Sequence, residues 1–329
     1  MQTFSYARPA TLADAIDATS QAGTWAIAGG TELVNWMKEG IASPRRLIDL
    51  NHIPGLDLIE ADDRELTIGA LARMSDVAAH PSVRNDFPAI SEALLKSASA
   101  QLRNMATMGG NLMQRTRCPY FRAEAELPCN MRRASSGCGA MDGEDRAGAL
   151  FGGNAHCIAT HPSDVAVALT ALDADVVVQG PGGQRRIAMT ALYRVPGETP
   201  GNPTVLDAGE LIVAISVPRS QTARFSHYVK IRERASYEFA LVSAAAGVAL
   251  DGEVIRAARI ALGGVAHKPW RLNAAEHALQ GLAIADSAAL GRALEEDFAS
   301  ARPGRQNAFK PELARRAAIR ALQTAGGAA

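Results

Sequence analysis

Cysteine is the residue type in this sequence with the clearest capacity for chemistry. The chain has four cysteines, all within residues 118–157: Cys118, Cys129, Cys138 and Cys157. Two disulfides are disfavoured, because a chain of this size needs no covalent staples and begins without an export signal. Structural zinc prefers pairs of cysteines with two residues between them, and no such pair occurs here. A 4Fe-4S cluster takes four thiolates from separate loops, so long irregular gaps suit it better.

The residues between the cysteines predict an irregular loop. Pro119, Pro128, Gly139 and the Gly152-Gly153 pair interrupt the segment, which has no helical or strand period. Arginines outnumber glutamates in and beside it, and their charge would offset that of an anionic cluster, although the same arginines could line a solvated loop. They are Arg115, Arg117, Arg122, Arg132 and Arg133, against Glu124 and Glu126.

Two glycine-rich turns precede the cysteines and are candidates for binding a nucleotide. In the first, residues 24–38 predict a strand, a Gly29-Gly30-Thr31 turn and a helix; the second turn spans 106–112. Glycines let the backbone approach a ligand, and the free N–H groups at a helix start attract a pyrophosphate. The first turn matches neither the Rossmann nor the P-loop spacing, and such a turn is as often a simple helix cap.

The elements that would position these residues fall into three regions. Residues 1–55 predict a small α/β lobe, residues 56–220 a second lobe with the cysteine insertion at about 115–158, and residues 221–329 a third domain. The predicted helices span 11–22, 75–79, 89–97, 165–172 and 311–324. The predicted strands span 46–50, 65–70, 175–179, 210–217 and 225–232, and a hairpin joins 241–250 to 254–262.

Composition limits the classes of partner. The 329 residues include 34 Lys and Arg and 34 Asp and Glu, so the net charge is zero and offers no field to attract nucleic acid. No apolar stretch reaches the roughly 20 residues of a membrane span. We therefore expect neither a nucleic-acid partner nor a membrane span. The first residues lack an export signal, so we expect a cytoplasmic location, or a periplasmic one reached with a signal-bearing partner.

Taken together, the two turns resemble the flavin signatures of the FAD-binding medium subunits of molybdenum hydroxylases, the xanthine dehydrogenase and carbon monoxide dehydrogenase group. The similar segments are Ala28-Gly29-Gly30-Thr31-Glu32-Leu33 and Thr107-Met108-Gly109-Gly110-Asn111-Leu112. In most members the second signature is followed directly by a helix start similar to Pro162-Ser163-Asp164, whereas in this chain residues 118–160 lie between the two. The insertion, with the segments QRTRCPYFR, RASYEFALVS and ALGGVAHKPWR, is similar to the subgroup of periplasmic aldehyde oxidoreductases, whose flavin subunits hold a 4Fe-4S cluster.

The resemblance implies an α+β fold: a two-lobed PCMH-type FAD-binding fold followed by a C-terminal α+β domain like that of carbon monoxide dehydrogenase flavoproteins. It implies FAD and a 4Fe-4S cluster as cofactors and no catalytic residue on this chain. The implied cluster ligands are Cys118, Cys129, Cys138 and Cys157. The implied FAD-binding residues are Ile27, Ala28, Gly29, Gly30, Thr31, Glu32, Leu33, Thr107, Gly110, Asn111, Asp164, Ile212 and Lys230.

The implied function is that of an electron-transfer subunit of a molybdenum-dependent aldehyde oxidoreductase. A large subunit with the molybdenum cofactor and a small subunit with 2Fe-2S clusters would complete a heterotrimer, and electrons would leave through FAD to an external acceptor. One alternative is the flavin subunit of a 4-hydroxybenzoyl-CoA reductase or of an aromatic or N-heterocycle hydroxylase. Two others are a self-contained flavin oxidase and a zinc-stabilised nucleotide-binding module.

Overall fold

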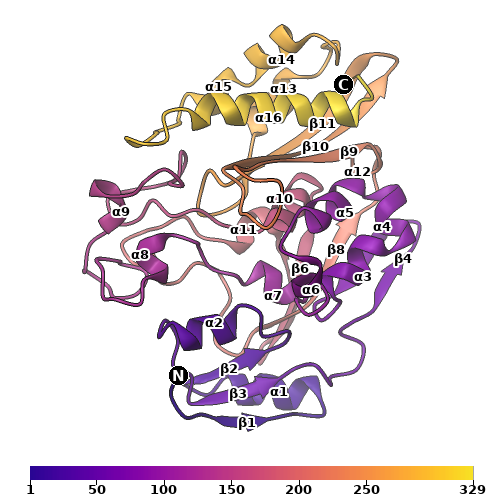
Figure 1. Cartoon of the computed structure of the whole chain (residues 1–329). Helices are drawn as coiled ribbons and strands as arrows, with labels where there is room; N and C mark the ends of the chain where they lie inside the picture. The colour runs from indigo at the N-terminus through magenta and orange to yellow at the C-terminus, as the bar shows by residue number, and fades with distance from the viewer. Residues whose placement is uncertain (329) are drawn as a thin grey trace.

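A computed structural model describes residues 1–328, in which three β-sheets are packed against helices (Figure 1). The N-terminal sheet is parallel, with strand order β1-β3-β2. Its first helix begins after Thr11, whose hydroxyl accepts a hydrogen bond from the Asp14 N–H at 3.2 Å. The elements are β1 (Ser5–Ala7), α1 (Leu12–Thr19), β2 (Thr24–Ile27), α2 (Leu33–Lys38) and β3 (Arg46–Asp49).

The second sheet is antiparallel, with the order β4-β5-β8-β6-β7. Leu66, Val176 and Ile215 are fully buried on its inner face, against the helices that connect its strands. The strands are β4 (Ile59–Ala61), β5 (Glu65–Gly69), β6 (Asp175–Gly180), β7 (Gly183–Ala188) and β8 (Leu211–Pro218). The helices are α3 (Met74–Ala79), α4 (Pro81–Asp86), α5 (Pro88–Leu95), α6 (Ala100–Arg103), α7 (Met108–Leu112), α10 (Asp164–Ala171) and α11 (Met189–Leu192).

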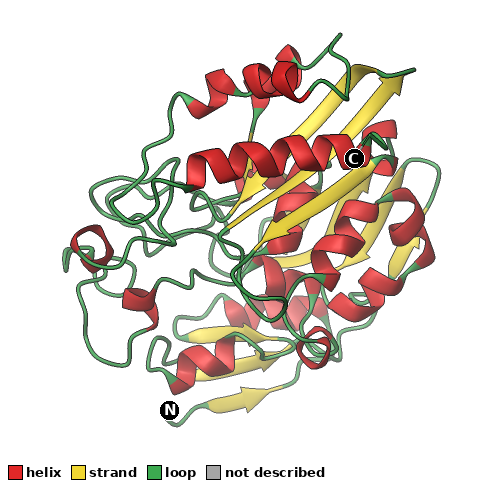
Figure 2. Ribbon diagram, turned by 45° about the horizontal axis from the view of Figure 1, so that its top comes forward, coloured by secondary structure: helices red, strands yellow, loops and turns green. Residues whose placement is uncertain are grey.

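The third sheet, with the order β12-β11-β10-β9, is covered on both faces. On β10, Ala244 and Ala246 belong to a core with the C-terminal helix α16, whereas Ala245 points into the core shared with the second sheet. Figure 2 shows α16 lying across this sheet. The strands are β9 (Ser226–Ile231), β10 (Val242–Asp251), β11 (Val254–Gly263) and β12 (Trp270–Arg271). The helices are α12 (Gln221–Arg224), α13 (Asn273–Ala278), α14 (Ser287–Ala293), α15 (Glu295–Phe298) and α16 (Lys310–Ala325).

The cysteine segment lies at one side of the molecule, between the N-terminal sheet and α16 in the view of Figure 1. It is mostly loop (Figure 2), with two single-turn helices, α8 (Pro119–Arg122) and α9 (Gly139–Asp142). The sequence analysis was wrong to expect no helix there, because Pro119 occupies the first turn of α8, where proline is favourable.

Other differences from the predicted elements have simple physical causes. The first helix ends at Thr19, before the left-handed Gly23 (φ +80°) that precedes β2. Strand β7 was not predicted, because Ile187 is its single buried residue and no apolar alternation marks it. The predicted hairpin is confirmed as β10 and β11. Within the described part of the chain, no helix combines the length and apolar character that a membrane crossing demands.

The far end of the cysteine segment is tied to the start of α16. The carboxylate of Asp145 accepts hydrogen bonds from the backbone N–H groups of Arg305 and Gln306, at 2.7 and 2.9 Å. The side-chain nitrogen of Lys310, which is fully buried, donates to the carbonyl oxygens of Gly148 at 2.8 Å and Gly264 at 2.6 Å. Burial lowers the pKa of Lys310 from 10.5 to about 7.

This burial predicts how stability depends on pH. Between pH 7 and pH 10, Lys310 is neutral in the folded chain and charged in the unfolded chain, so unfolding takes up a proton and stability rises with pH by about 1.4 kcal/mol per unit. Lys310→Met removes this contribution. Between pH 7.5 and pH 9.5, we expect the free energy of unfolding of the wild-type chain to rise by about 2 to 3 kcal/mol more than that of the variant.

Urea denaturation at the two pH values measures this difference. Lys38→Met, which replaces an exposed lysine, is the control and should follow the wild-type chain at both pH values. Parallel pH profiles for wild type and Lys310→Met would show that Lys310 keeps its proton in the folded state.

Candidate functional site

A large cleft of about 980 Å³ opens between the N-terminal sheet, the second sheet and β9. Its volume lies at the upper end of the range of about 300–1,000 Å³ that is usual for ligand pockets. Every residue that the sequence analysis assigned to FAD lines it. These are Ile27, Ala28, Gly29, Gly30, Thr31, Glu32, Leu33, Thr107, Gly110, Asn111, Asp164, Ile212 and Lys230. The structure thus brings the predicted binding residues together from five separate segments, while their contact with FAD stays a prediction.

The two glycine-rich turns meet at the wall of this cleft. A Cβ at position 29 would collide with the carbonyl oxygen of Met105, so only glycine permits the first turn to lie against the segment before the second. Gly30 adopts a left-handed conformation, with φ of +71°. In the second turn, the Thr107 hydroxyl accepts a hydrogen bond from the Gly110 N–H at 3.2 Å. Two backbone turns therefore line the same part of the cleft.

A buried charge cluster forms another wall. The Asp164 side chain is 6% exposed, and it accepts hydrogen bonds from Tyr228 at 2.5 Å, Ser97 at 2.7 Å and Lys230 at 2.8 Å. Lys230 also donates to the carbonyl oxygen of Lys96 at 3.1 Å. Burial, and then the neighbouring Asp164 charge, raise the pKa of Tyr228 well above 10, so Tyr228 remains a hydrogen-bond donor. Asp164 thus fixes the position of the Lys230 ammonium group in the cleft.

Glu32, at the start of α2, has its carboxylate fully engaged by the cysteine segment. Arg117 donates to both of its oxygens, at 2.8 and 2.9 Å, and Arg122 donates to Oε1 at 2.6 Å. The Trp36 indole N–H and the Arg115 backbone N–H also donate to Oε1, at 3.0 and 3.2 Å. A bidentate arginine and carboxylate pair is among the strongest polar contacts in proteins. The first glycine turn and the start of the cysteine segment are therefore tied together.

The four cysteines lie in one region and are free thiols in this structure. Cys129 and Cys157 are buried in an apolar cluster against which Cys118 packs, and Cys129 and Cys138 pair through an isolated backbone bridge. A hydrogen bond with the Cys157 thiol lowers the pKa of Cys138. In the part of the chain that the structure covers, no three His, Cys, Asp or Glu side chains are grouped as ligands of a metal ion.

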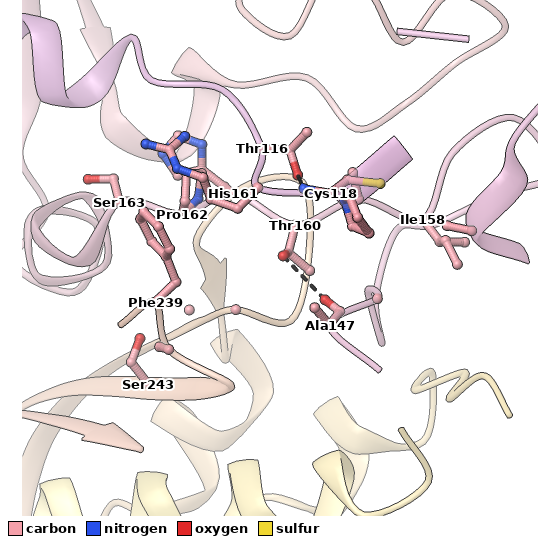
Figure 3. Close-up of a pocket in the computed structure, with 18 of the residues that line it drawn as sticks. Thr116, Cys118, Ala147, Ile158, Thr160, His161, Pro162, Ser163, Phe239 and Ser243 are labelled. Atoms are coloured by element: carbon pink, nitrogen blue, oxygen red, sulfur yellow. Dashed lines mark hydrogen bonds between the residues drawn. The ribbon is translucent and has the colours of Figure 1, made fainter. Parts of the chain in front are cut away.

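A small cavity of about 70 Å³ lies beside Cys118 (Figure 3). Cys118 and Ile158 lie on one side of it in Figure 3, and Ser163 and Phe239 on the other. His161, Asp164 and Phe239 line both this cavity and the large cleft. The cysteine region and the cleft are therefore adjacent, with only a short gap between them.

Some residues of the cleft were not predicted to lie there. Arg115, Arg117 and Arg122 were assigned only to the charge balance of the cysteines, but they also line the cleft. Tyr237 and Phe239 are about half exposed at its edge, in a loop that the sequence analysis noted only as part of the RASYEFALVS segment. No local pattern could have placed Tyr237 and Phe239 there, because they lie far along the chain from both glycine turns. The three arginines closely follow the second turn, and that proximity was the available signal.

Comparison with known families finds two matching regions. Residues 2–220 match the FAD binding domain in molybdopterin dehydrogenase, and residues 227–325 match the CO dehydrogenase flavoprotein C-terminal domain. These matches confirm the expected α+β fold class, in which an FAD-binding region precedes a carbon monoxide dehydrogenase flavoprotein-like domain.

Individual relatives agree with the families. The chain is 49% identical over 319 residues to the aldehyde oxidoreductase FAD-binding subunit PaoB of Escherichia coli K12, with 96% of each chain covered. It is 27% identical to the carbon monoxide dehydrogenase medium chain of Afipia carboxidovorans, over 89% of this chain and 84% of that one. The crystal structure of Cu,Mo-CO dehydrogenase in its cyanide-inactivated form has a TM-score of 0.76 and 25% identity, covering 99% of this chain and 98% of that chain. The chain therefore belongs to the FAD-binding medium subunits of the molybdenum hydroxylases, and it is an oxidoreductase subunit of the xanthine dehydrogenase family.

Proposed function

We propose that this chain is the FAD and 4Fe-4S electron-transfer subunit of a molybdenum-dependent aldehyde oxidoreductase. The observation that carries the proposal is that the cleft and the cavity beside Cys118 share lining residues. Arg117 lines the large cleft and is followed directly by Cys118, and His161, Asp164 and Phe239 are shared by the cleft and the small cavity beside Cys118. Electron transfer between centres requires such proximity, and a chain with this arrangement needs no substrate-oxidising residue of its own.

The cleft fits FAD in size and in the chemistry of its walls. The start of α2 presents backbone N–H groups suited to a pyrophosphate, whereas those of residues 108–111 at the start of α7 donate to oxygens of the protein. Trp25, Leu71 and Ile212 add apolar surface. Lys230, held by Asp164, would place a positive charge beside the flavin. When bound, FAD supplies the conversion between single electrons and electron pairs. The residues of this chain bind and orient it, and the apolar walls exclude water.

The cysteines fit a 4Fe-4S cluster better than a single ion. A cubane is several ångströms across and is held at its corners, so its ligands need not converge on one point as zinc ligands do. Cys118, Cys129 and Cys157 belong to one apolar region with Phe121, Cys138 is joined to Cys129 by a backbone bridge, and none of the four forms a disulfide in this structure. Arg115 and Arg122, which flank this region, would balance the charge of a cluster with four thiolates.

The proposed partners follow from the nature of the relatives. Names such as FAD-binding subunit and medium chain describe components of larger enzymes. We propose a small subunit with 2Fe-2S clusters and a large subunit with the molybdenum cofactor as the source of electrons, and an external acceptor as their destination. We also propose that the domains divide near residues 55 and 220, with the cluster insertion at about 115–158, and that the domain from 221 to 329 completes the subunit.

The glycine turn provides a test of the flavin assignment. Gly29→Ala places a methyl group against the Met105 carbonyl, so the two turns must move apart. We expect FAD to bind at least about tenfold more weakly, measured by flavin fluorescence after dialysis of the purified complex. Gly182→Ala is the matched control, because a Cβ there meets nothing and φ is not positive. Unchanged FAD affinity in Gly29→Ala would contradict the assignment.

The cluster assignment is tested by metal analysis of the anaerobically purified complex. The wild-type complex should contain FAD and more iron and sulfide than the 2Fe-2S partner can supply. Cys138→Ala removes one proposed ligand and should lower iron and sulfide per complex. Glu126→Ala, an exposed change in the same segment, should lower neither. Unchanged iron in Cys138→Ala, or zinc in place of the excess iron, would refute the 4Fe-4S assignment.

A further inference from the structure

Arg117 connects three parts of the molecule that are far apart in sequence. Its guanidinium forms the bidentate pair with Glu32 in the first glycine turn, and its Nη2 also donates to the Gln114 side chain at 3.1 Å. The same group lies 4.5 Å from the centre of the Phe239 ring, in the loop at the edge of the cleft. Arg117 is also the residue before Cys118. Its contacts therefore reach the cysteine segment, the glycine turn and the edge of the cleft.

Arg117 and Glu32 are screened only weakly by water. Their side chains are 26% and 17% exposed, whereas those of the Arg133–Glu126 pair in the same segment are 72% and 85% exposed. Arg122, which also binds Glu32, pairs in addition with Glu39 at 3.3 Å. Replacing Glu32 removes the carboxylate that pairs with Arg117, whereas replacing Arg117 leaves Glu32 paired with Arg122 alone. Either change at this half-buried group costs more than losing an exposed pair.

The role of the Glu32 carboxylate is therefore different from that of its neighbours in the turn. Its two oxygens already accept five hydrogen bonds, four of them from residues 115–122. A carboxylate would also repel a pyrophosphate in the same turn. The Glu32 side chain thus binds residues 115–122, while the backbone of the turn lines the cleft.

We propose that the Arg117–Glu32 pair couples the two cofactor sites, so that filling the cysteine site favours binding of FAD and filling the cleft stabilises the cysteine segment. The inference rests on the proposed function. The segment before Cys118 is held in place by the same carboxylate that accepts a hydrogen bond from the Trp36 indole of α2, so order in one site reduces the cost of ordering the other. Coupling between two binding sites is reciprocal, and values of five- to hundredfold in affinity are typical. Arg117 and Glu32 are positioning residues in this scheme.

The test uses the purified complex and the variants Arg117→Met, Glu32→Gln and the double variant. Each single substitution should raise the dissociation constant of FAD about tenfold, and the double variant should be no worse than either alone, because both remove the same link. Cys138→Ala, through loss of the cluster, should weaken FAD binding to a similar extent. Arg117→Lys should restore only part of the affinity, because lysine cannot form the bidentate pair. Arg133→Met, an exposed change in the same segment, is the control and should leave FAD affinity and iron content unchanged.

The reciprocal measurement is the rate at which iron is lost to a chelator. Removal of FAD should speed this loss in the wild-type complex and should have little further effect in Arg117→Met. If Arg117 instead contacts FAD directly, Glu32→Gln will keep wild-type affinity and the effects of the two substitutions will add, which overturns the coupling. If the wild-type complex contains flavin and excess iron and Arg117→Met binds FAD as tightly as wild type, the coupling is overturned but the proposed function stands. A wild-type complex without flavin or without excess iron would instead overturn the proposed function.

Discussion

The arrangement of the cleft depends on one buried carboxylate, that of Asp164. A buried carboxylate is stable only when hydrogen-bond donors and a counter-charge surround it, and Asp164 has both in Ser97, Tyr228 and Lys230. Ser97 follows α5, and the other two donors are on β9 of the third sheet. The charge balance that permits Asp164 to be buried therefore also holds the third sheet against the second, and gives the cleft its fixed wall.

The cysteine segment is held at both ends rather than by secondary structure of its own. At one end, arginines of the segment pair with Glu32 in the N-terminal region, and at the other, Asp145 and the carbonyl of Gly148 bond to the start of α16. Loops of this length are otherwise mobile and lose much conformational entropy on ordering. Two polar anchors, one half-buried at Glu32 and one fully buried at Lys310, reduce that freedom, which is why a largely irregular segment can hold its cysteines in one region.

Several charged residues of the chain are concentrated in one place, although its net charge is zero. The total is zero, yet three arginines gather where the cysteine segment meets the cleft, and two glutamates face them. Such a site suits groups with several negative charges, as FAD and a thiolate-bound cluster both have.

The sequence by itself determined the elements with a clear apolar period and the chemistry of single segments, but not β7 or the short helices of the cysteine segment. Periodicity and turn residues marked the hairpin of β10 and β11 and the helix α16, and the spacing of glycines marked both turns, because these signals are local. The resemblance between the glycine turns and a known family supplied the candidate FAD residues. Only the tertiary structure decided that Glu32 is bound by Arg117 and Arg122, or that Phe239 lies over Arg117. Those contacts join residues separated by more than 80 positions, and they depend on how three sheets pack, which no local pattern encodes.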